Sequence, residues 1–263
     1  MPLTLFDSHA HYDDSAFDCD REALLDLLPS KGVCGIVNAA SDLSSTRRGI
    51  ALAERYPYVW AAAGIHPQEA GHWCDEEGNP SPEAVQELRA LCSHPRVVAV
   101  GEIGLDYYYD TPGRECQRRW LRCQLALAAE LHLPVILHDR EAHEDTLKLL
   151  RQHPVEGVVH CFSGSVEMAR ELVRLGYYIG LGGAVTFKNA RRAPLVAAAV
   201  PADRLLLETD APYMTPVPFR GKRNQSDYIA YTARRIAELR GITAEELCHQ
   251  TAENTRRLFR IPE

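Results

Sequence analysis

The sequence predicts an α/β protein with a (β/α)8, or TIM-barrel, fold of the metal-dependent hydrolase type. Short β-rich runs recur along the whole chain, and segments with helical spacing separate them. The runs are apolar almost throughout, which is typical of parallel strands buried on both faces. Eight such runs in a chain of 263 residues favour a closed barrel.

Strands and helices are expected to alternate along the chain. The predicted strands lie at 3–9, 33–39, 58–66, 97–106, 133–139, 156–162, 177–183 and 204–210. The predicted helices between them lie at 21–32, 43–56, 81–94, 117–132, 145–152, 166–176 and 191–200.

The stretch from about 227 through 259 predicts two further helices that would complete the outer ring. Gly241 would end the first helix, and Thr243 would be the N-cap of the second. No low-complexity linker interrupts the chain, so residues 1–263 are expected to form a single TIM-barrel domain.

Composition and charge exclude several classes of protein. The formal net charge of -7 gives no general attraction to nucleic acid or to anionic membranes, so any nucleic-acid contact must be local. No apolar run approaches the roughly 20 residues of a membrane span, and the first residues lack a signal-peptide pattern. The eight cysteines form no C-x-x-C pair, which argues against a zinc knuckle or a redox dithiol. We expect a cytoplasmic protein without a membrane partner.

Two histidines end the first predicted strand. His9 and His11 are two residues apart, and side chains at this spacing on a strand point the same way. Both imidazoles can therefore reach one metal ion. A single His-x-His pair is weak support, because such pairs also occur in loops without a ligand.

Further histidines and carboxylates end other predicted strands. Glu102 lies inside an apolar run, where an ionised carboxylate is costly unless it meets a cation or a set of donors. His138 and His160 each close a strand, as core histidines also can. Glu208 and Asp210 end the last strand with the same two-residue spacing, for which a salt-bridged pair is the alternative.

Taken together, these positions predict a metal centre at the carboxyl end of the barrel, where barrel active sites lie. The expected ligands are His9, His11, Glu102, His138, His160 and Asp210. Mixed nitrogen and oxygen donors suit Zn, Mn, Fe or Co better than Mg, although a carboxylate-rich site can accept Mg. Six ligands are too many for one tetrahedral ion, so we expect two divalent metal cations that share a bridging carboxylate.

The sequence resembles the TatD family of metal-dependent deoxyribonucleases, within the wider group of amidohydrolase-like barrels. The resemblance extends from Phe6 to about Phe259. It is carried by the segments FDSHAHYD, GIHPQ, VGEIGLDYY, PVILHDREA, HCFSGS, YYIGLGGAVTFKN, LLLETDAPYMTP and PFRGKRNQ. The chain departs from many relatives at Ser226, where they carry proline.

The resemblance implies both a ligand set and a reaction. One cation would be held by His9, His11, Glu102 and Asp210, and the other by Glu102, His138 and His160. The implied reaction is hydrolysis of phosphodiester bonds in DNA by a 3'-5' exonuclease, with single strands or frayed ends as the substrate and no obligate protein partner. Asp210 would accept the proton of the attacking water, and Glu208 would orient that water or a ligand.

Basic and aromatic residues near the same end are candidates for substrate binding. The expected substrate-binding residues are His66, Arg140, Lys188, Arg220 and Arg223. Exposed Lys and Arg are more often simply solvated, so each candidate is weak by itself. Tyr107 and Tyr108 could stack on a base or could pack against the protein.

Two other functions remain open from the sequence. Related barrels hydrolyse small-molecule esters, amides or lactones, and the ligand set does not distinguish these substrates. A non-catalytic role in binding or protein quality control is the other alternative, although a complete ligand set argues against it.

Overall fold

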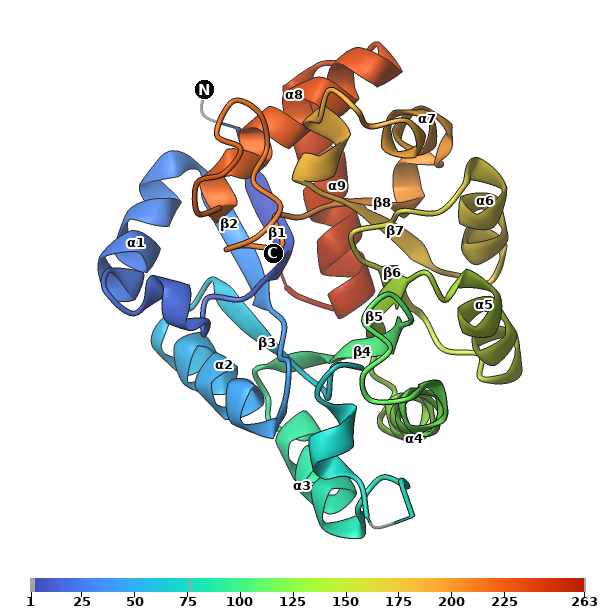
Figure 1. Cartoon of the computed structure of the whole chain (residues 1–263). Helices are drawn as coiled ribbons and strands as arrows, with labels where there is room; N and C mark the ends of the chain where they lie inside the picture. Colours follow the sequence, from blue (N-terminus) through green and yellow to red (C-terminus); the bar gives the residue numbers. More distant parts are fainter. Residues whose placement is uncertain (1–2, 76, 263) are drawn as a thin grey trace.

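The computed structural model of the protein describes residues 3–75 and 77–262. Within them, eight parallel strands form one sheet whose spatial order follows the chain from β1 to β8. The strands are β1 (Leu5–Ala10), β2 (Val33–Asn38), β3 (Val59–Ala63), β4 (Val97–Asp106), β5 (Val135–Arg140), β6 (Gly157–Val159), β7 (Tyr178–Leu181) and β8 (Leu205–Leu207). All eight predicted strands are present, and the predicted barrel is confirmed (Figure 1).

Helices follow the strands and surround the sheet in Figure 1. The α-helices are α1 (Arg21–Leu27), α2 (Leu43–Arg55), α3 (Pro82–Cys92), α4 (Arg114–Leu131), α5 (His143–Gln152), α6 (Val166–Arg174), α7 (Arg192–Ala199), α8 (Ile229–Arg240) and α9 (Ala244–Phe259). Short 3-10 helices are η1 (Ser15–Phe17), η2 (Leu28–Lys31), η3 (Ala70–Trp73), η4 (Gly183–Thr186), η5 (Ala202–Arg204) and η6 (Ser226–Tyr228). The predicted helix at 21–32 ends as an α-helix at Leu27 and continues as η2.

The barrel closes between β8 and β1 at the carboxyl ends of the strands. The backbone N–H of Asp210 donates to the carbonyl of His9 at 2.9 Å, and the N–H of His11 donates to the carbonyl of Ala211 at 2.7 Å. Below them, the Ser8 hydroxyl donates to the carbonyl of Leu207 at 3.0 Å. These bonds join the two ends of the barrel at the point where three predicted metal ligands lie.

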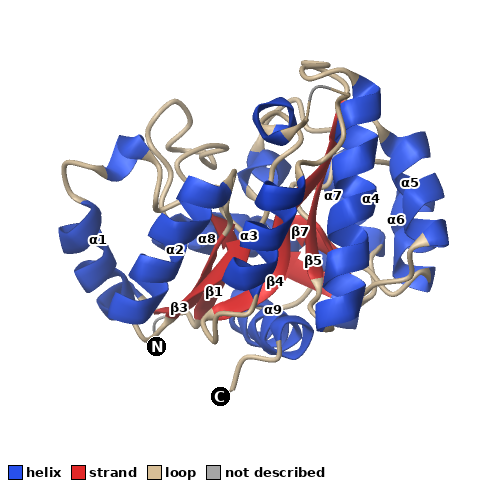
Figure 2. Cartoon of the chain, turned by 90° about the horizontal axis from the view of Figure 1, so that it is seen from below, coloured by secondary structure: helices blue, strands red, loops and turns tan. Residues whose placement is uncertain are grey.

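The last two helices begin and end as the sequence predicts, but α9 does not join the outer ring. Gly241 ends α8 in a left-handed conformation with φ of 67°, and Thr243 caps α9 in a capping box with Glu246. The Asn254 side chain of α9 donates to the carbonyls of Ala202 and Leu205, where β8 begins. Helix α9 therefore lies across the amino end of the barrel (Figure 2).

The apolar interior of the barrel explains why α9 lies across its amino end. Each strand contributes one buried residue to an inner apolar cluster, namely Phe6, Val37, Ala62, Ala99, Ile136, Val158, Tyr178 and Leu206. Ala252, Leu258 and Phe259 of α9 belong to the same cluster, together with Ile261 just after the helix. Packing α9 here removes apolar surface from water that an outer-ring position would leave open. The amino end is thus sealed, and the carboxyl end remains for chemistry.

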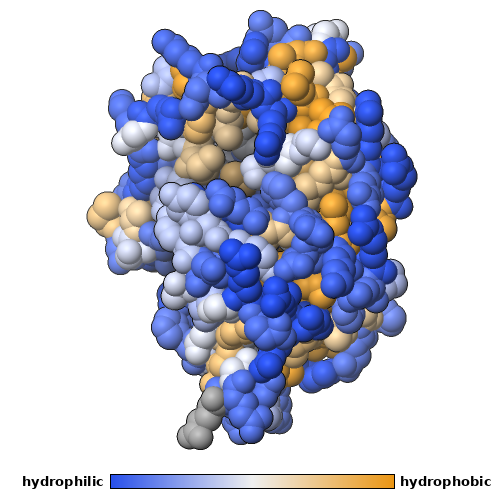
Figure 3. All heavy atoms as spheres, turned by 45° about the vertical axis from the view of Figure 1, so that its right-hand side comes forward, coloured by the Kyte–Doolittle hydropathy of each residue, from blue (hydrophilic) through white to orange (hydrophobic). Residues whose placement is uncertain are grey.

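The outer surface is that of a barrel covered by amphipathic helices. The face formed by α5, α6 and their neighbours is mainly hydrophilic with scattered apolar atoms (Figure 3). Among residues 3–75 and 77–262, no helix combines the length and the apolar character needed to cross a bilayer.

Replacing Phe259, the α9 residue that packs beneath the strands, should destabilise the fold without affecting the metal centre. Phe259 is 2% exposed, so Phe259→Ala should lower the free energy of unfolding by about 3–5 kcal/mol through lost burial and a residual cavity. Urea unfolding followed by circular dichroism measures this change. Leu195→Ala, at a position that is 64% exposed on α7, is the control and should change stability by less than about 0.5 kcal/mol. Equal effects of the two substitutions would contradict this packing role of α9.

Candidate metal centre

Histidine and carboxylate side chains converge at the carboxyl end of the barrel. Three groups of donor atoms, each within 4.8 Å of one another, could hold a metal ion. They are His9 with Glu102 and His160, His9 with His11 and Asp210, and His66 with Glu102 and His138. The structure therefore brings together all six ligands that the sequence predicts, and it adds His66. The groups overlap because His9 and Glu102 each belong to two of them.

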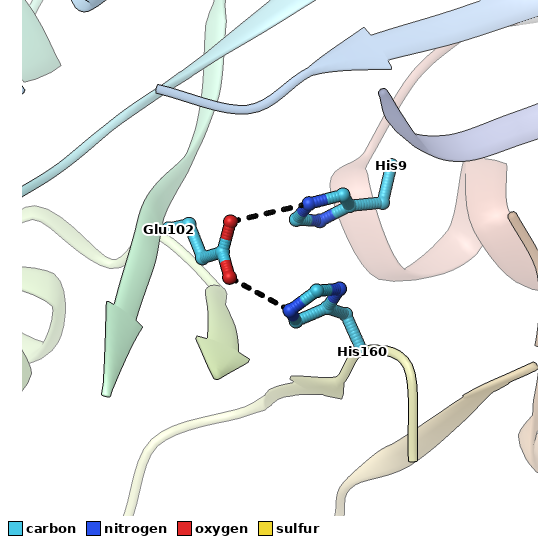
Figure 4. A group of neighbouring side chains, drawn as sticks. All are labelled: His9, Glu102 and His160. Atoms are coloured by element: carbon cyan, nitrogen blue, oxygen red, sulfur yellow. Dashed lines mark ion pairs between the residues drawn. The ribbon is translucent and has the colours of Figure 1, made fainter. Parts of the chain in front are cut away.

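Glu102 of β4 lies at the middle of these groups. Its carboxylate lies 2.7 Å from Nε2 of His160, 2.9 Å from Nδ1 of His138 and 3.3 Å from Nε2 of His9. Figure 4 shows His9 and His160 pointing toward the two oxygens of the carboxylate. Burial raises the pKa of Glu102, but the surrounding imidazoles outweigh it and hold the pKa well below the usual range. Glu102 is therefore a buried negative charge.

His9 of β1 and His11, which directly follows β1, present the same nitrogen to the centre. Nε2 of His9 and Nε2 of His11 lie 3.0 Å apart, and Oδ1 of Asp210 lies 3.7 Å and 3.4 Å from them. On its other side, Nδ1 of His11 donates to the carbonyl of Ala39 at 2.9 Å. This bond leaves the lone pair of Nε2 in neutral His11 directed at the centre, as metal ligation requires.

The protonation equilibria of the histidines reflect the same electrostatic field. Burial, aided by His160, lowers the pKa of His9 to about 4, so this imidazole is neutral at physiological pH. Burial also lowers the pKa of His11 and His138, but neighbouring carboxylates outweigh it. Asp210 and Glu102 raise the pKa of His11 to about 10, and Asp106 and Glu102 raise that of His138 to about 9. Negative potential that attracts protons also attracts metal cations.

The donor set fits divalent cations. It combines imidazole nitrogens with the ionised carboxylates of Glu102 and Asp210, whose pKa values both lie below the usual range. Glu102 lies within β4 and His9 lies within β1, so both donors are held by rigid strands of the barrel. Asp210 lies three residues after β8, where its backbone is bonded to that of His9. In the cation-free protein, Nε2 of His9 and Nε2 of His11 lie at hydrogen-bond distance, 3.0 Å apart.

Glu208, predicted as a catalytic residue, lies beside the centre and outside the pocket. Its side chain is 1% exposed, and Oε1 accepts a hydrogen bond from the backbone N–H of Cys161. Burial raises the pKa of Glu208 to about 8. Asp210, by contrast, lines the pocket.

A pocket of about 880 Å³ opens from the metal centre. Its wall includes His66 and Arg140, two of the predicted substrate-binding residues, together with carboxylates such as Asp13 and Asp18. Arg140 is exposed, and its guanidinium lies 4.0 Å from the ring centre of Tyr108. A cationic and aromatic rim thus borders one side of the pocket.

The other three predicted substrate-binding residues lie away from the pocket wall. Arg223 donates to both oxygens of Asp20 at 2.6 and 2.7 Å and covers the ring of Phe17. Arg220 lies 4.0 Å from the ring centre of Phe187. Lys188 is exposed to solvent. Arg223 is therefore engaged in the fold, and the structure does not bring these three cations together with Arg140.

The sequence left two roles open for Tyr107 and Tyr108, and the structure places the two side chains in different surroundings. Tyr107 donates its hydroxyl to Asp145 at 2.6 Å and packs against the apolar core. Tyr108 is 54% exposed and is free to contact a ligand.

Two buried carboxylates near the centre escaped the sequence analysis. Asp7 accepts hydrogen bonds from the hydroxyls of Thr209 and Ser226, each at 2.6 Å, and so ties the segment after β8 and η6 to β1. Asp106, at the end of β4, contacts Nε2 of His138 at 3.3 Å. Both were visible as acidic residues within apolar runs, at an even spacing from His9 and Glu102 respectively. The same two-residue period that identified the ligands could have found them.

Comparisons with known proteins identify the family of this chain. A family model described as TatD related DNase matches residues 6–260. The Bacillus subtilis (strain 168) protein YabD, named an uncharacterized metal-dependent hydrolase, is 42% identical over 260 residues, which cover 98% of this chain and 99% of that protein. The 3'-5' ssDNA/RNA exonuclease TatD of Musicola paradisiaca (strain Ech703) is 37% identical and covers 98% of both chains.

Comparison with solved structures points to the same family. The crystal structure of YjjV, a TatD homolog from Escherichia coli K12, aligns with a TM-score of 0.90 at 37% identity and covers 100% of both chains. The resemblance in the sequence is thereby confirmed, and the chain belongs to the TatD-related DNase family of metal-dependent hydrolases.

Proposed function

We propose that this chain is a two-metal 3'-5' exonuclease that acts on single-stranded nucleic acid and that its whole length serves as one catalytic domain. The observation that carries the proposal is the position of Glu102, which two donor groups share at the base of an open pocket. A carboxylate in this position is suited to bridge two cations. The name of the Musicola relative, an exonuclease of single-stranded DNA and RNA, supports the choice of substrate.

The ligands divide into two sets around Glu102. His9, His11 and Asp210 would hold one cation with Glu102, and His138 and His160 would hold the other with it. Two cations so placed, when bound, supply a water molecule of lowered pKa and stabilise charge on the attacking and leaving oxygens of a phosphodiester. Mg, Mn and Zn are the candidate ions.

The side chains of the pocket perform the remaining steps. The Asp210 carboxylate is ionised at neutral pH and lines the pocket, so it accepts the proton that the attacking water loses. Arg140 and His66 line the same pocket and donate hydrogen bonds to substrate phosphates. Glu208, held against the backbone of Cys161, supports the His160 side of the centre from below.

The pocket also favours a chain end over a duplex. Its volume of about 880 Å³ is in the range of small-molecule sites, which suits one terminal nucleotide. The overall charge of -7 supplies no general attraction to nucleic acid, so binding depends on the cations and on the few basic residues at the rim.

Release of nucleotides from end-labelled single-stranded DNA tests the proposal directly. Metal-stripped protein is resupplied with Mg, Mn or Zn, and digestion is expected from the 3' end with at least one of these ions. Labels at either end distinguish the polarity. Failure with every ion would overturn the nuclease proposal and direct the search to small esters, amides and lactones.

Asp210→Asn should abolish most turnover while the protein remains folded. Loss of a ligand and of the proton acceptor should reduce kcat by at least about 10²–10⁴-fold. Asp203→Asn, an exposed acidic residue at the amino end of β8, is the control and should retain normal kcat. A near-normal rate in Asp210→Asn would refute the assigned role.

His138→Ala should remove about one equivalent of metal and leave the other site filled, because His138 belongs to only one of the donor groups. Metal content after dialysis, measured by mass spectrometry, checks this result. His249→Ala, with a side chain that is 73% exposed on α9, should bind as the unmodified protein does. Full metal content in His138→Ala would show that the two-site assignment is incorrect.

Cation affinity should rise with pH. The pKa of His138 is about 9 and that of His11 about 10 in the cation-free protein, so both carry an extra proton at neutral pH. A cation must displace these protons in order to bind. At pH values below the two pKa values, each displaced proton makes the cation affinity increase about tenfold per pH unit. Calorimetric titration of metal-stripped protein with Mn at several pH values between about 6 and 9 measures the slope. An affinity independent of pH would contradict this competition.

A further inference from the structure

The carboxylate of Asp106, the last residue of β4, is completely buried and held on several sides. Its Oδ1 accepts hydrogen bonds from the backbone N–H groups of Tyr108 and Tyr109 at 3.0 and 3.1 Å. Its Oδ2 accepts from the amide of Gln68 at 2.8 Å. Gln68 belongs to the segment after β3, so Asp106 links two neighbouring rim segments.

The backbone of Asp106 is fixed as firmly as its side chain. Gln117 of α4 accepts from the N–H of Asp106 at 2.8 Å and donates to its carbonyl at 3.0 Å. The same amide of Gln117 donates to the carbonyl of Pro112 at 2.8 Å, which closes the loop between β4 and α4. The carboxylate of Asp106 therefore has little freedom to move.

The remaining contact of Asp106 is with a candidate ligand. Its Oδ2 lies 3.3 Å from Nε2 of His138, while Nδ1 of the same imidazole lies 2.9 Å from Oε1 of Glu102. Both oxygens of Asp106 accept hydrogen bonds from N–H groups, which is the pattern of a carboxylate without a hydrogen. Such a carboxylate can only accept, so Nε2 of His138 carries the hydrogen of the contact between them.

We propose that Asp106 is the positioning residue of His138, whose Nε2–H it holds so that Nδ1 presents its lone pair to the metal centre. This inference rests on the proposed function, in which His138 is a cation ligand. A carboxylate behind a ligating imidazole fixes the tautomer and the ring orientation and increases the basicity of the ligand. Gln68 and the turn at 108–109 keep that carboxylate in place.

Asp106→Asn tests the role with little change in shape. The Asn oxygen would keep the hydrogen bonds from Tyr108 and Tyr109, and its NH2 group would replace Oδ2 beside His138. A donor in that position favours the tautomer that carries the hydrogen on Nδ1, and Nδ1 then has no lone pair with which to ligate a cation. Zn affinity of the His138 site, measured by competition with a chelator, should fall about 10–100-fold.

Asp139→Asn is the matched control. Asp139 is the next residue after His138, and its buried carboxylate lies 2.9 Å from Nδ1 of another histidine, His143. This variant should bind two equivalents of Zn with normal affinity. Unchanged affinity in Asp106→Asn, when His138→Ala loses one equivalent, overturns the positioning role alone. Unchanged binding in both Asp106→Asn and His138→Ala overturns the ligand assignment on which it rests.

A measurement on the unmodified protein is independent of how well the variants fold. In Zn-loaded protein with 15N-labelled histidine, two-bond 1H–15N spectra should show His138 as an imidazole with its hydrogen on Nε2 and its ligating lone pair on Nδ1. Ligation of His138 through Nε2 would overturn the proposal, because Asp106 would then face the wrong nitrogen.

Discussion

A buried negative charge on Glu102 is the constraint on which the carboxyl end of this barrel depends. An ionised carboxylate inside a protein is costly, and several kcal/mol are lost unless cations or hydrogen-bond donors surround it. Here the compensation comes from imidazoles of β1, β5 and the segment after β6, of which His160, His138 and His9 approach to 2.7, 2.9 and 3.3 Å. The same arrangement that makes the charge tolerable in the cation-free protein prepares the site for divalent cations.

The rest of the fold holds these groups in place. The bonds of Asp210 and His11 across the β8–β1 seam place ligands from the two ends of the chain in one centre. Asp7, beneath the seam, binds Thr209 and Ser226 and so fixes the chain on either side of Asp210. Ser226 thus takes part in the support of the centre. Helix α9 closes the opposite end, and the pocket lies at the end where the candidate ligands converge.

The wall of the pocket carries both carboxylates and basic side chains. Carboxylates such as Asp13 and Asp18 line the wall beside Arg140, while Arg223 is neutralised by Asp20. Such a pocket has little intrinsic attraction for a polyanion. Bound cations would reverse that balance, which couples substrate binding to metal occupancy.

The sequence by itself determined the order of elements, the eight strands and the candidate ligands. Period-two spacing at strand ends identified His9, His11 and Asp210, because strand geometry is local and the strand ends of a barrel share one rim. Glu102 was identified by its position inside an apolar run, where an ionised carboxylate is costly. Only the tertiary structure decided how β8 meets β1, that α9 covers the amino end, that Arg223 pairs with Asp20, and that Asp106 lies behind His138. These features depend on contacts between residues far apart in the chain, and a local pattern specifies which face a side chain occupies but not which partner it meets there.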